Sequence, residues 1–198
     1  MSEPAVDALV ASMLDVPVAL LRTPGLHAVP ALPGYAGIYV WHHGETTIVA
    51  ADRALGPSRH SYLALAGATF VADPDVRRVA SEADVAMLRA AVGDDEWHEG
   101  GFGEDVQDHW WVLGDGLAAG NMTDFAGAPT DVGLVTHPRH RRRGLAERVA
   151  RHMLAWARDE GHAVARYRAL TTNAPSLRVA EKLGFSAFGE NVAVRPPS

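Results

Sequence analysis

The sequence predicts an α/β fold, and three observations support that prediction. Its 198 residues are 47% hydrophobic, which is enough to build a core in one domain or in a domain with an extension. From about residue 110 onward, short apolar runs that end at glycine or proline alternate with segments of helical periodicity. The order strand, basic turn, helix, strand, helix, strand indicates a sheet that is at least partly parallel.

The composition excludes several classes of protein. The formal net charge is −6 and the pI about 5.9, whereas a domain that embraces a polyanion is usually basic. The absence of cysteine excludes a disulfide framework, thiolate metal ligands and a cysteine nucleophile. The start is acidic where a secretory signal would be basic, and no run approaches eighteen apolar residues. We therefore expect a cytoplasmic protein with no membrane partner and no nucleic-acid partner.

Residues 1–80 form the predicted N-terminal α/β extension. An apolar helix is expected near residues 6–22, followed by a Pro/Gly-rich crossing at 24–37. The stretch IYVWHHGETTIVAA predicts two short strands joined at residues 43–45. The next element, residues 58–66, is expected to be helical.

Residues 81–198 form the predicted core. Ser81 and Asp84 have the spacing of a capping box that begins a helix, and Gly93 supplies its end. The clearest helical pattern follows the basic turn and ends at Gly161. Its apolar stripe consists of Leu145, Val149, Met153 and Trp156. The predicted strands are 110–113, 116–123, 132–136, 163–170 and a last strand or hairpin at 185–194, with a short helix at 173–183 between the last two.

The stretch VTHPRHRRRGLA, residues 135–146, carries four arginines within five positions and leads into the helix with the apolar stripe. A strand that turns through glycine into a helix presents the free N–H groups of the first helical turn in one cluster, which is an anion site. The glycine allows close approach of the backbone, and the arginines add charge-assisted donors. The stretch has neither the GK[ST] of a Walker A loop nor the three glycines of a dinucleotide fingerprint.

Two motifs in order resemble the GNAT superfamily of acetyl-CoA-dependent N-acetyltransferases. The first is Gln or Arg, two residues, Gly, one residue, then Gly or Ala, matched by Arg141, Gly144 and Ala146. The second is NAPSLRVAEKLGF, residues 173–185, which is similar to the family's next helix with its terminal Leu-Gly-Phe. The resemblance covers about residues 110–195. It implies a mixed, splayed sheet flanked by helices, with acetyl-CoA bound as co-substrate and no metal.

The resemblance also implies which positions hold the cofactor. The backbone of Leu134, Val135 and Thr136 would pair with the pantetheine arm, and the N–H of Val135 is the expected oxyanion donor. Asn173 and Ser176 would contact the arm from the following helix. The pyrophosphate would be held by the turn and the helix start, at Arg141, Arg142, Arg143, Gly144, Leu145 and Ala146.

The acceptor is predicted to be a small-molecule amine, and an acidic stretch is its expected binding site. Residues 90–138 contain ten Asp or Glu and neither Lys nor Arg, and an amine arrives as a cation. Acetyl transfer needs a neutral amine, so a base is required. The candidates are Asp131, Glu104, Glu99 and His109; a histidine near its ordinary pKa of about 6.5 could take the proton directly. Trp97 and Phe102 in the same stretch either pack in the core or contact the acceptor.

One position departs from the family pattern. Many members carry a tyrosine four residues before the Gly-Phe, and Ala180 stands there. Another group protonates the leaving thiolate, or none is needed, because a thiol with a pKa of about 8.5 leaves readily. This gap supports one alternative, an inactive acyl-CoA-binding sensor; nucleic-acid binding through residues 139–143 is the other. The sequence is compatible with a homodimer but does not determine the oligomeric state.

Overall fold

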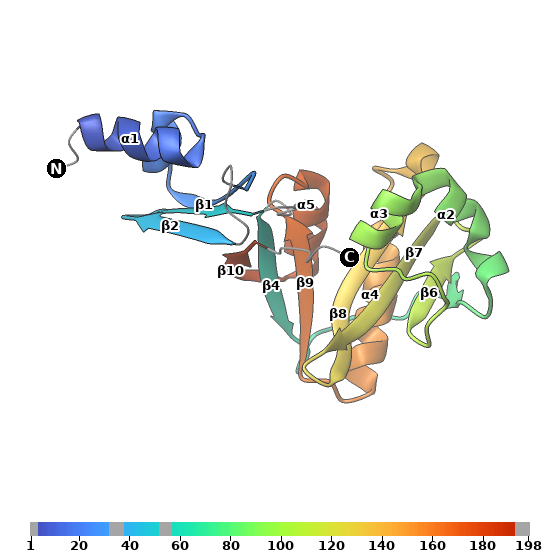
Figure 1. The fold of residues 1–198 in the computed structure, drawn as a ribbon. Coiled ribbons are helices and arrows are strands. Elements are labelled where there is room, and N and C mark those ends of the chain that lie inside the picture. Colours follow the sequence, from blue (N-terminus) through green and yellow to red (C-terminus); the bar gives the residue numbers. More distant parts are fainter. Residues whose placement is uncertain (1–3, 32–37, 52–56, 193–198) are drawn as a thin grey trace. The chain divides into compact units, whose positions relative to one another are not determined.

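The computed structural model of the chain describes residues 4–31, 38–51 and 57–192 (Figure 1). The chain divides into two compact units. The first contains residues 1–59, 169–173 and 189–198, and the second contains residues 60–168 and 174–188. The predicted boundary at residue 80 stays a prediction. Part of the predicted crossing, residues 32–37, and the last residues of the predicted C-terminal strand lie outside the described residues.

The first unit holds a helix and a small sheet. Its elements are α1 (Pro4–Leu14), the 3₁₀ helix η1 (Val18–Arg22), β1 (Gly25–Val29), β2 (Tyr39–His43) and β3 (Thr46–Ala50). The strand order is β1-β3-β2, with β1 parallel and β2 antiparallel to β3. The two strands predicted in IYVWHHGETTIVAA are thus confirmed, and β1 is a strand within the predicted crossing.

The predicted helix at residues 6–22 is interrupted. Asp15 has a left-handed φ of 52°, and Pro17 precedes η1 with extended backbone. Proline has no N–H for a helical hydrogen bond and disfavours helical backbone at the preceding residue, so one long helix cannot form. The two short pieces still bury apolar side chains, since Leu14 and Leu21 pack with Ile48 of β3.

A larger sheet extends through the second unit. Its strand order in the described residues is β10-β4-β9-β8-β7-β6-β5. The strands are β4 (Ser58–Ala64), β5 (Val76–Arg78), β6 (Trp110–Leu113), β7 (Ala118–Phe125), β8 (Ala128–Thr136), β9 (Val164–Leu170) and β10 (Ser186–Asn191). The pairs from β5 to β8 are antiparallel and β8 is parallel to β9, which confirms the predicted mixed sheet.

The prediction of a helix at residues 58–66 is wrong, because residues 58–64 form β4. This strand lies between β9 and β10, so its backbone groups bond to neighbours on both sides. The segment SRHSYLA has no strict alternation, and pairing with two strands outweighs its weak local preference.

Helices cover both faces of this sheet where β6, β7 and β8 lie. The long helix α4 (Leu145–Asp159) packs on one face, where Gly120 of β7 leaves room for Val149 and Met153. On the other face lie α2 (Ala86–Val92) and the unpredicted α3 (Asp94–Glu99). The core there includes Leu88 and Trp97 with Val135 of β8. The remaining helical elements are η2 (Glu82–Asp84), η3 (Pro138–His140) and α5 (Ala174–Leu183).

The predicted helix boundaries are confirmed in part. Ser81 and Asp84 form the capping box, and the Asp84 carboxylate accepts the Ser81 N–H at 3.1 Å, but the box caps the 3₁₀ turn η2, and α2 begins only at Ala86. Gly93 follows α2 with a φ of 79°, a backbone conformation that favours glycine. The stripe of α4 is also correct, because Val149 and Met153 are fully buried.

Candidate active site

Strand β8 carries the backbone positions predicted to pair with the cofactor arm. It pairs with β7 as far as its last residue. Its parallel pairing with β9 joins Asp131 to Arg166 and Val132 to Tyr167, and within the described chain it extends no further. Among the described residues no β9 partner pairs with β8 beyond Val132, so the edge of β8 from Gly133 onward is open on that side; Figure 1 shows the order of these strands. An open strand edge can accept an extended ligand as an added strand.

The side chains of this open segment point to the two faces of the sheet. Val135 is buried on the face covered by α2 and α3. Leu134 lies opposite Gly120, on the α4 face. Because both side chains are used in packing, a ligand at the edge would meet the backbone of residues 133–136 rather than these side chains.

The turn after β8 leads directly to the start of α4. Arg142 and Gly144 have left-handed φ values of 62° and 75°. Gly144 is the N-cap of α4, and no side chain caps the first turn. A Cβ built on Gly144 would meet no described atom within 4 Å, so the space before the free N–H groups is open. An exposed, uncapped helix start of this kind can hold an anion, and its binding of a pyrophosphate stays a prediction.

The arginines of the turn differ in their contacts. Arg141 donates from Nη2 to both carboxylate oxygens of Glu96 in α3, at 2.6 Å each. Its Nε lies 3.4 Å from the carbonyl oxygen of Thr136, the last residue of β8. Arg142 and Arg143 are exposed. The signature arginine therefore joins α3 to the end of β8, while its neighbours extend from the turn toward solvent.

Asp131, the candidate base on β8, is bound to Arg166 of β9. Both carboxylate oxygens accept a guanidinium N–H, at 2.9 and 2.6 Å. The two side chains are only 10% and 13% exposed, and the guanidinium lies 3.7 Å from the centre of the Phe125 ring. A carboxylate held on both oxygens by an arginine is poorly disposed to take a proton, so the geometry favours a structural role.

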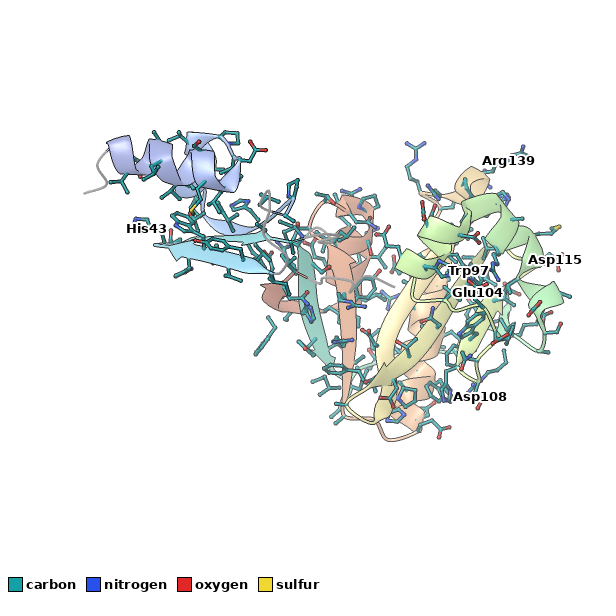
Figure 2. The ribbon with its side chains drawn as sticks, in the orientation of Figure 1. His43, Trp97, Glu104, Asp108, Asp115 and Arg139 are labelled. Carbon is teal, nitrogen blue, oxygen red and sulfur yellow. The ribbon has the colours of Figure 1, made fainter. Side chains whose placement is uncertain are left out.

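Glu104 is also engaged by cations. It accepts hydrogen bonds from Arg89 at 2.6 Å and from His98 at 3.0 Å, and these two partners, Arg89 first, hold the pKa of the Glu104 carboxyl below its usual range. It lies near Trp97 (Figure 2), and both residues line a cavity of about 430 Å³ beside α2. Trp97 also packs in the core with Val135, so its indole ring borders the cavity on the side of the core.

Glu99 is the candidate base whose neighbouring backbone packs on β8. It is exposed, ends α3 and precedes Gly100. A Cβ built on Gly100 would lie 2.6 Å from the Val135 side chain and 3.3 Å from the Leu134 carbonyl oxygen. The backbone next to Glu99 thus lies directly on the open segment of β8.

His109 lies at the other end of the second unit. Its ring is 4.9 Å from the ring of Trp156, near the C-terminal end of α4. Eleven residues separate Trp156 from Leu145 at the helix start, a rise of about 16 Å. Figure 2 shows the neighbouring Asp108 far from Arg139. Burial, and next Arg78, lower the pKa of His109.

The helix after β9 carries the other predicted cofactor contacts. Asn173 immediately precedes α5, and the Ser176 hydroxyl lies 3.0 Å from that of Tyr167 on β9. Burial raises the pKa of Tyr167, so its hydroxyl keeps its proton at neutral pH. Ala180 is buried one helical turn after Ser176. The Tyr167 and Ser176 pair therefore places hydroxyl protons near the position where the family's tyrosine is missing.

Asn121 is a site residue that the sequence reasoning missed. It is fully buried on β7, directly opposite Gly133. The sequence signal was an amide within the otherwise small and apolar run AAGNM. The two aromatic residues of the acidic stretch turn out to be core residues, since Trp97 and Phe102 are 1% and 2% exposed and their rings stack at 4.2 Å.

Metal ligation and membrane insertion have no counterpart in what the structure describes. Across residues 4–31, 38–51 and 57–192, no three side chains of the His, Cys, Asp or Glu type come together as a metal ion requires. In the same ranges, no helix has both the length and the apolar character needed to cross a membrane.

An open strand edge that leads into an uncapped, arginine-flanked helix start defines an α/β protein with a site for an extended anionic carrier. Residues 55–186, about two thirds of the sequence, match the model of the acetyltransferase (GNAT) domain. The chain therefore belongs to the GNAT acetyltransferase family and is an acyltransferase by family. Among curated proteins, no relative matches it.

Solved structures support the same fold. One is a putative acetyltransferase of the GNAT family from Novosphingobium aromaticivorans, with 22% identity, a TM-score of 0.54, and coverage of 85% of this chain and 69% of that one. A GNAT-family acetyltransferase from Colwellia psychrerythraea has 17% identity and a TM-score of 0.51, covering 70% and 55%. A Drosophila protein has 18% identity and a TM-score of 0.53, covering 70% and 50%. This chain thus spans about half the length of the last two.

Proposed function

We propose that this protein transfers the acetyl group of acetyl-CoA directly to the primary amine of a small molecule. The observation that carries the proposal is the continuity of the open β8 edge, the turn and the uncapped start of α4. Together they offer backbone donors and acceptors for an amide-containing arm, followed by an anion site for its pyrophosphate. When bound, acetyl-CoA supplies the thioester carbonyl.

The open segment of β8 holds and polarises the acyl group. In the antiparallel register Val135 lies opposite Ala119, and His137, two residues on, donates to the Leu117 carbonyl, so the Val135 N–H points toward β7. The N–H of its neighbour Leu134, on the open edge, is proposed instead as the donor to the carbonyl oxygen, where negative charge develops during attack. A preorganised backbone donor in a site shielded from water stabilises that charge without rearrangement. In the transfer, a C–N bond forms, the C–S bond breaks, and one proton leaves the amine nitrogen.

Glu99 is proposed as the base that receives this proton, directly or through water. Asp131 and Glu104 have their carboxylates bound by arginines, and His109 lies at the far end of α4. Glu99 adjoins the backbone that packs on Leu134 and Val135. For the leaving thiolate, the Tyr167 and Ser176 hydroxyl pair is proposed as the proton donor.

The packing of the loop after α3 supports a small acceptor. Gly100 lies so close to Val135 that any side chain there would displace it. This face of β8 is thus covered by backbone, which suits an enclosed amine better than an extended protein tail.

The test uses the absence of cysteine in the chain, because a thiol reagent then detects only released CoA. Purified protein would be incubated with acetyl-CoA and, separately, spermidine, tyramine, ethanolamine and an unblocked peptide. Amine-dependent thiol release with one of the three small amines supports the proposal. Cofactor binding by calorimetry without release on any amine would instead indicate the acyl-CoA-binding sensor, and release with the peptide alone would contradict a small acceptor.

A further inference from the structure

The side-chain oxygen of Asn121 is the feature that the proposed function leaves unexplained. Among the described residues, it is the one buried side-chain nitrogen or oxygen atom with no hydrogen-bond partner. Leaving such an acceptor unsatisfied destabilises the folded state. Buried polar atoms in folded proteins nearly always have a partner, so a persistent exception indicates a function or a missing ligand atom.

The orientation of the amide is fixed by its other end. The side-chain nitrogen of Asn121 donates to the carbonyl oxygen of Gly100 at 2.9 Å. Reversing the amide would place two oxygen acceptors against each other, so the nitrogen must face Gly100. The unsatisfied atom is therefore the oxygen, a pure acceptor that needs an N–H or O–H donor.

Three glycines surround this oxygen. A Cβ built on Gly133 would lie 2.6 Å from the Asn121 oxygen and would also collide with the Gly100 carbonyl oxygen. One built on Gly101 would lie 3.2 Å from the same oxygen. The oxygen thus occupies the position that a side chain of residue 133 would fill, above the backbone of β8.

Gly133 lies where the pairing of β8 with β9 ends. Val132 is the last residue of β8 that pairs with β9, and Gly133 is the first on the open edge. In the proposed function, the thioester lies along this edge beside Leu134. An acceptor oxygen above Gly133, on the face covered by α3, is therefore next to where the amine and the acyl carbon would meet.

We propose that Asn121 is a substrate-positioning residue whose side-chain oxygen accepts an N–H from the acceptor amine as that amine attacks the thioester. This inference rests on the proposed function. A neutral primary amine has two N–H groups and one lone pair, so a fixed acceptor for one N–H orients the lone pair toward the acyl carbon. An amide oxygen cannot remove the proton, which leaves that task to a separate base. The ligand class is a primary amine.

The Gly101 backbone must move aside to admit the amine, because Asn121 is fully buried beneath it, while the bond to Gly100 keeps the amide oriented. Two hydrogen bonds hold this loop, from Asn121 to Gly100 and from the Trp97 indole N–H to the Gly103 carbonyl at 3.0 Å. The second bond provides a matched control, since Trp97→Phe loosens the same loop without altering Asn121.

The experiment compares wild type, Asn121→Ala, Asn121→Ser and Trp97→Phe in the thiol-release assay, with the best of the four named amines as probe. Calorimetric CoA binding and thermal unfolding are measured in parallel. The Asn121 variants are expected to raise the KM for the amine or lower kcat, with kcat/KM falling about tenfold, the value of one lost hydrogen bond. Affinity for CoA should change less than twofold, and Trp97→Phe should retain kcat/KM. Asn121→Ser keeps a polar group and serves as the folded variant if Asn121→Ala does not fold.

Different results would overturn the transferase function and the role of Asn121. If wild type binds CoA but releases no thiol with any amine, the proposed transferase function is overturned, and the role of Asn121 with it. If wild type is active and the Asn121 variants keep the amine kcat/KM, the positioning role alone is overturned. Equal losses in the Asn121 and Trp97 variants would show that Asn121 acts only by holding the loop.

Discussion

The basic turn and the acidic stretch lie next to each other in the sequence, yet the structure treats them in opposite ways. The turn at residues 139–146 leaves most of its cations exposed and its helix start uncapped. In the acidic stretch at residues 90–138, key carboxylates are neutralised by arginines from outside it. These pairs are Arg89 with Asp94 and Glu104, Arg141 with Glu96, and Arg166 with Asp131.

This difference shows that a local backbone motif predicts a site better than net charge does. The geometry of the turn is set over a few consecutive residues, so its motif predicts its local structure directly. The stretch was interpreted through its net charge, and net charge does not reveal which partners the fold brings in. A run of ten acids therefore does not make a cation site when several of them already have arginine partners.

The largest expected effect concerns Glu99, the residue proposed as the base. Glu99→Gln should lower kcat about 100-fold or more, because general-base catalysis contributes on the order of 10²–10⁴. The affinity for CoA should not change; the thiol-release assay measures the rate and calorimetry measures the affinity. Asp95→Asn on the same helix removes the same charge and should retain activity; a matching loss there would mean that helix charge, not proton transfer, controls the rate.

The next effect concerns an acid that the fold has already paired. Asp131→Asn leaves the Arg166 guanidinium nearly buried without its partner, and should lower the free energy of unfolding by about 3 kcal/mol. Urea denaturation measures the change, and adding Arg166→Met should recover part of it. An unchanged unfolding midpoint together with a reduced rate would restore Asp131 as the base.

The expected effect of a substitution in the basic turn is intermediate in size. Gly144→Glu places a carboxylate where the pyrophosphate is expected, and should weaken CoA binding about 30-fold, or about 2 kcal/mol. Because Gly144 has a φ of 75°, any side chain adds strain, so Gly144→Ala is the matched control for backbone effects. Calorimetry gives both affinities, and equal losses in the two variants would remove the pyrophosphate assignment.

The smallest effect concerns His109, whose role is placed in packing rather than in catalysis. Its folded pKa lies below the unfolded value of about 6.5, so between these values the unfolded chain binds more protons. The free energy of unfolding should therefore fall as the pH drops through about 6.5. In His109→Phe this fall should be smaller. Urea midpoints at pH 7.5, 6.5 and 5.5 measure this fall. A larger fall in the variant would contradict a lowered pKa of His109.

Most of the second half of the fold could be predicted from the sequence. The stripe of α4 and the stop at Gly93 are local features, set by periodicity and by a backbone conformation that favours glycine. The errors came where tertiary pairing decides. Residues 58–64 form β4 because strands on both sides complete its hydrogen bonds, and α3 is too short to show a period.

The site divides in the same way. The turn from Arg141 to Ala146 and the strand before it could be predicted, because the spacing of the motif residues reflects the local backbone structure. Asn121 could not be predicted, because only strand register places it opposite Gly133, and its unsatisfied oxygen exists only once the loop at Gly100 closes over it. The pairing of Asp131 with Arg166 likewise joins residues 35 positions apart.

By itself, therefore, the sequence determined the α/β class, the order of elements after residue 110 and the glycine turn that leads into α4. Each of these depends on interactions between residues a few positions apart, which local patterns record. The tertiary structure decided where β8 and β9 part, which acids are neutralised and which amide lies above the open edge. Those features depend on partners distant in the sequence, whose approach is set by sheet register and core packing rather than by any local pattern.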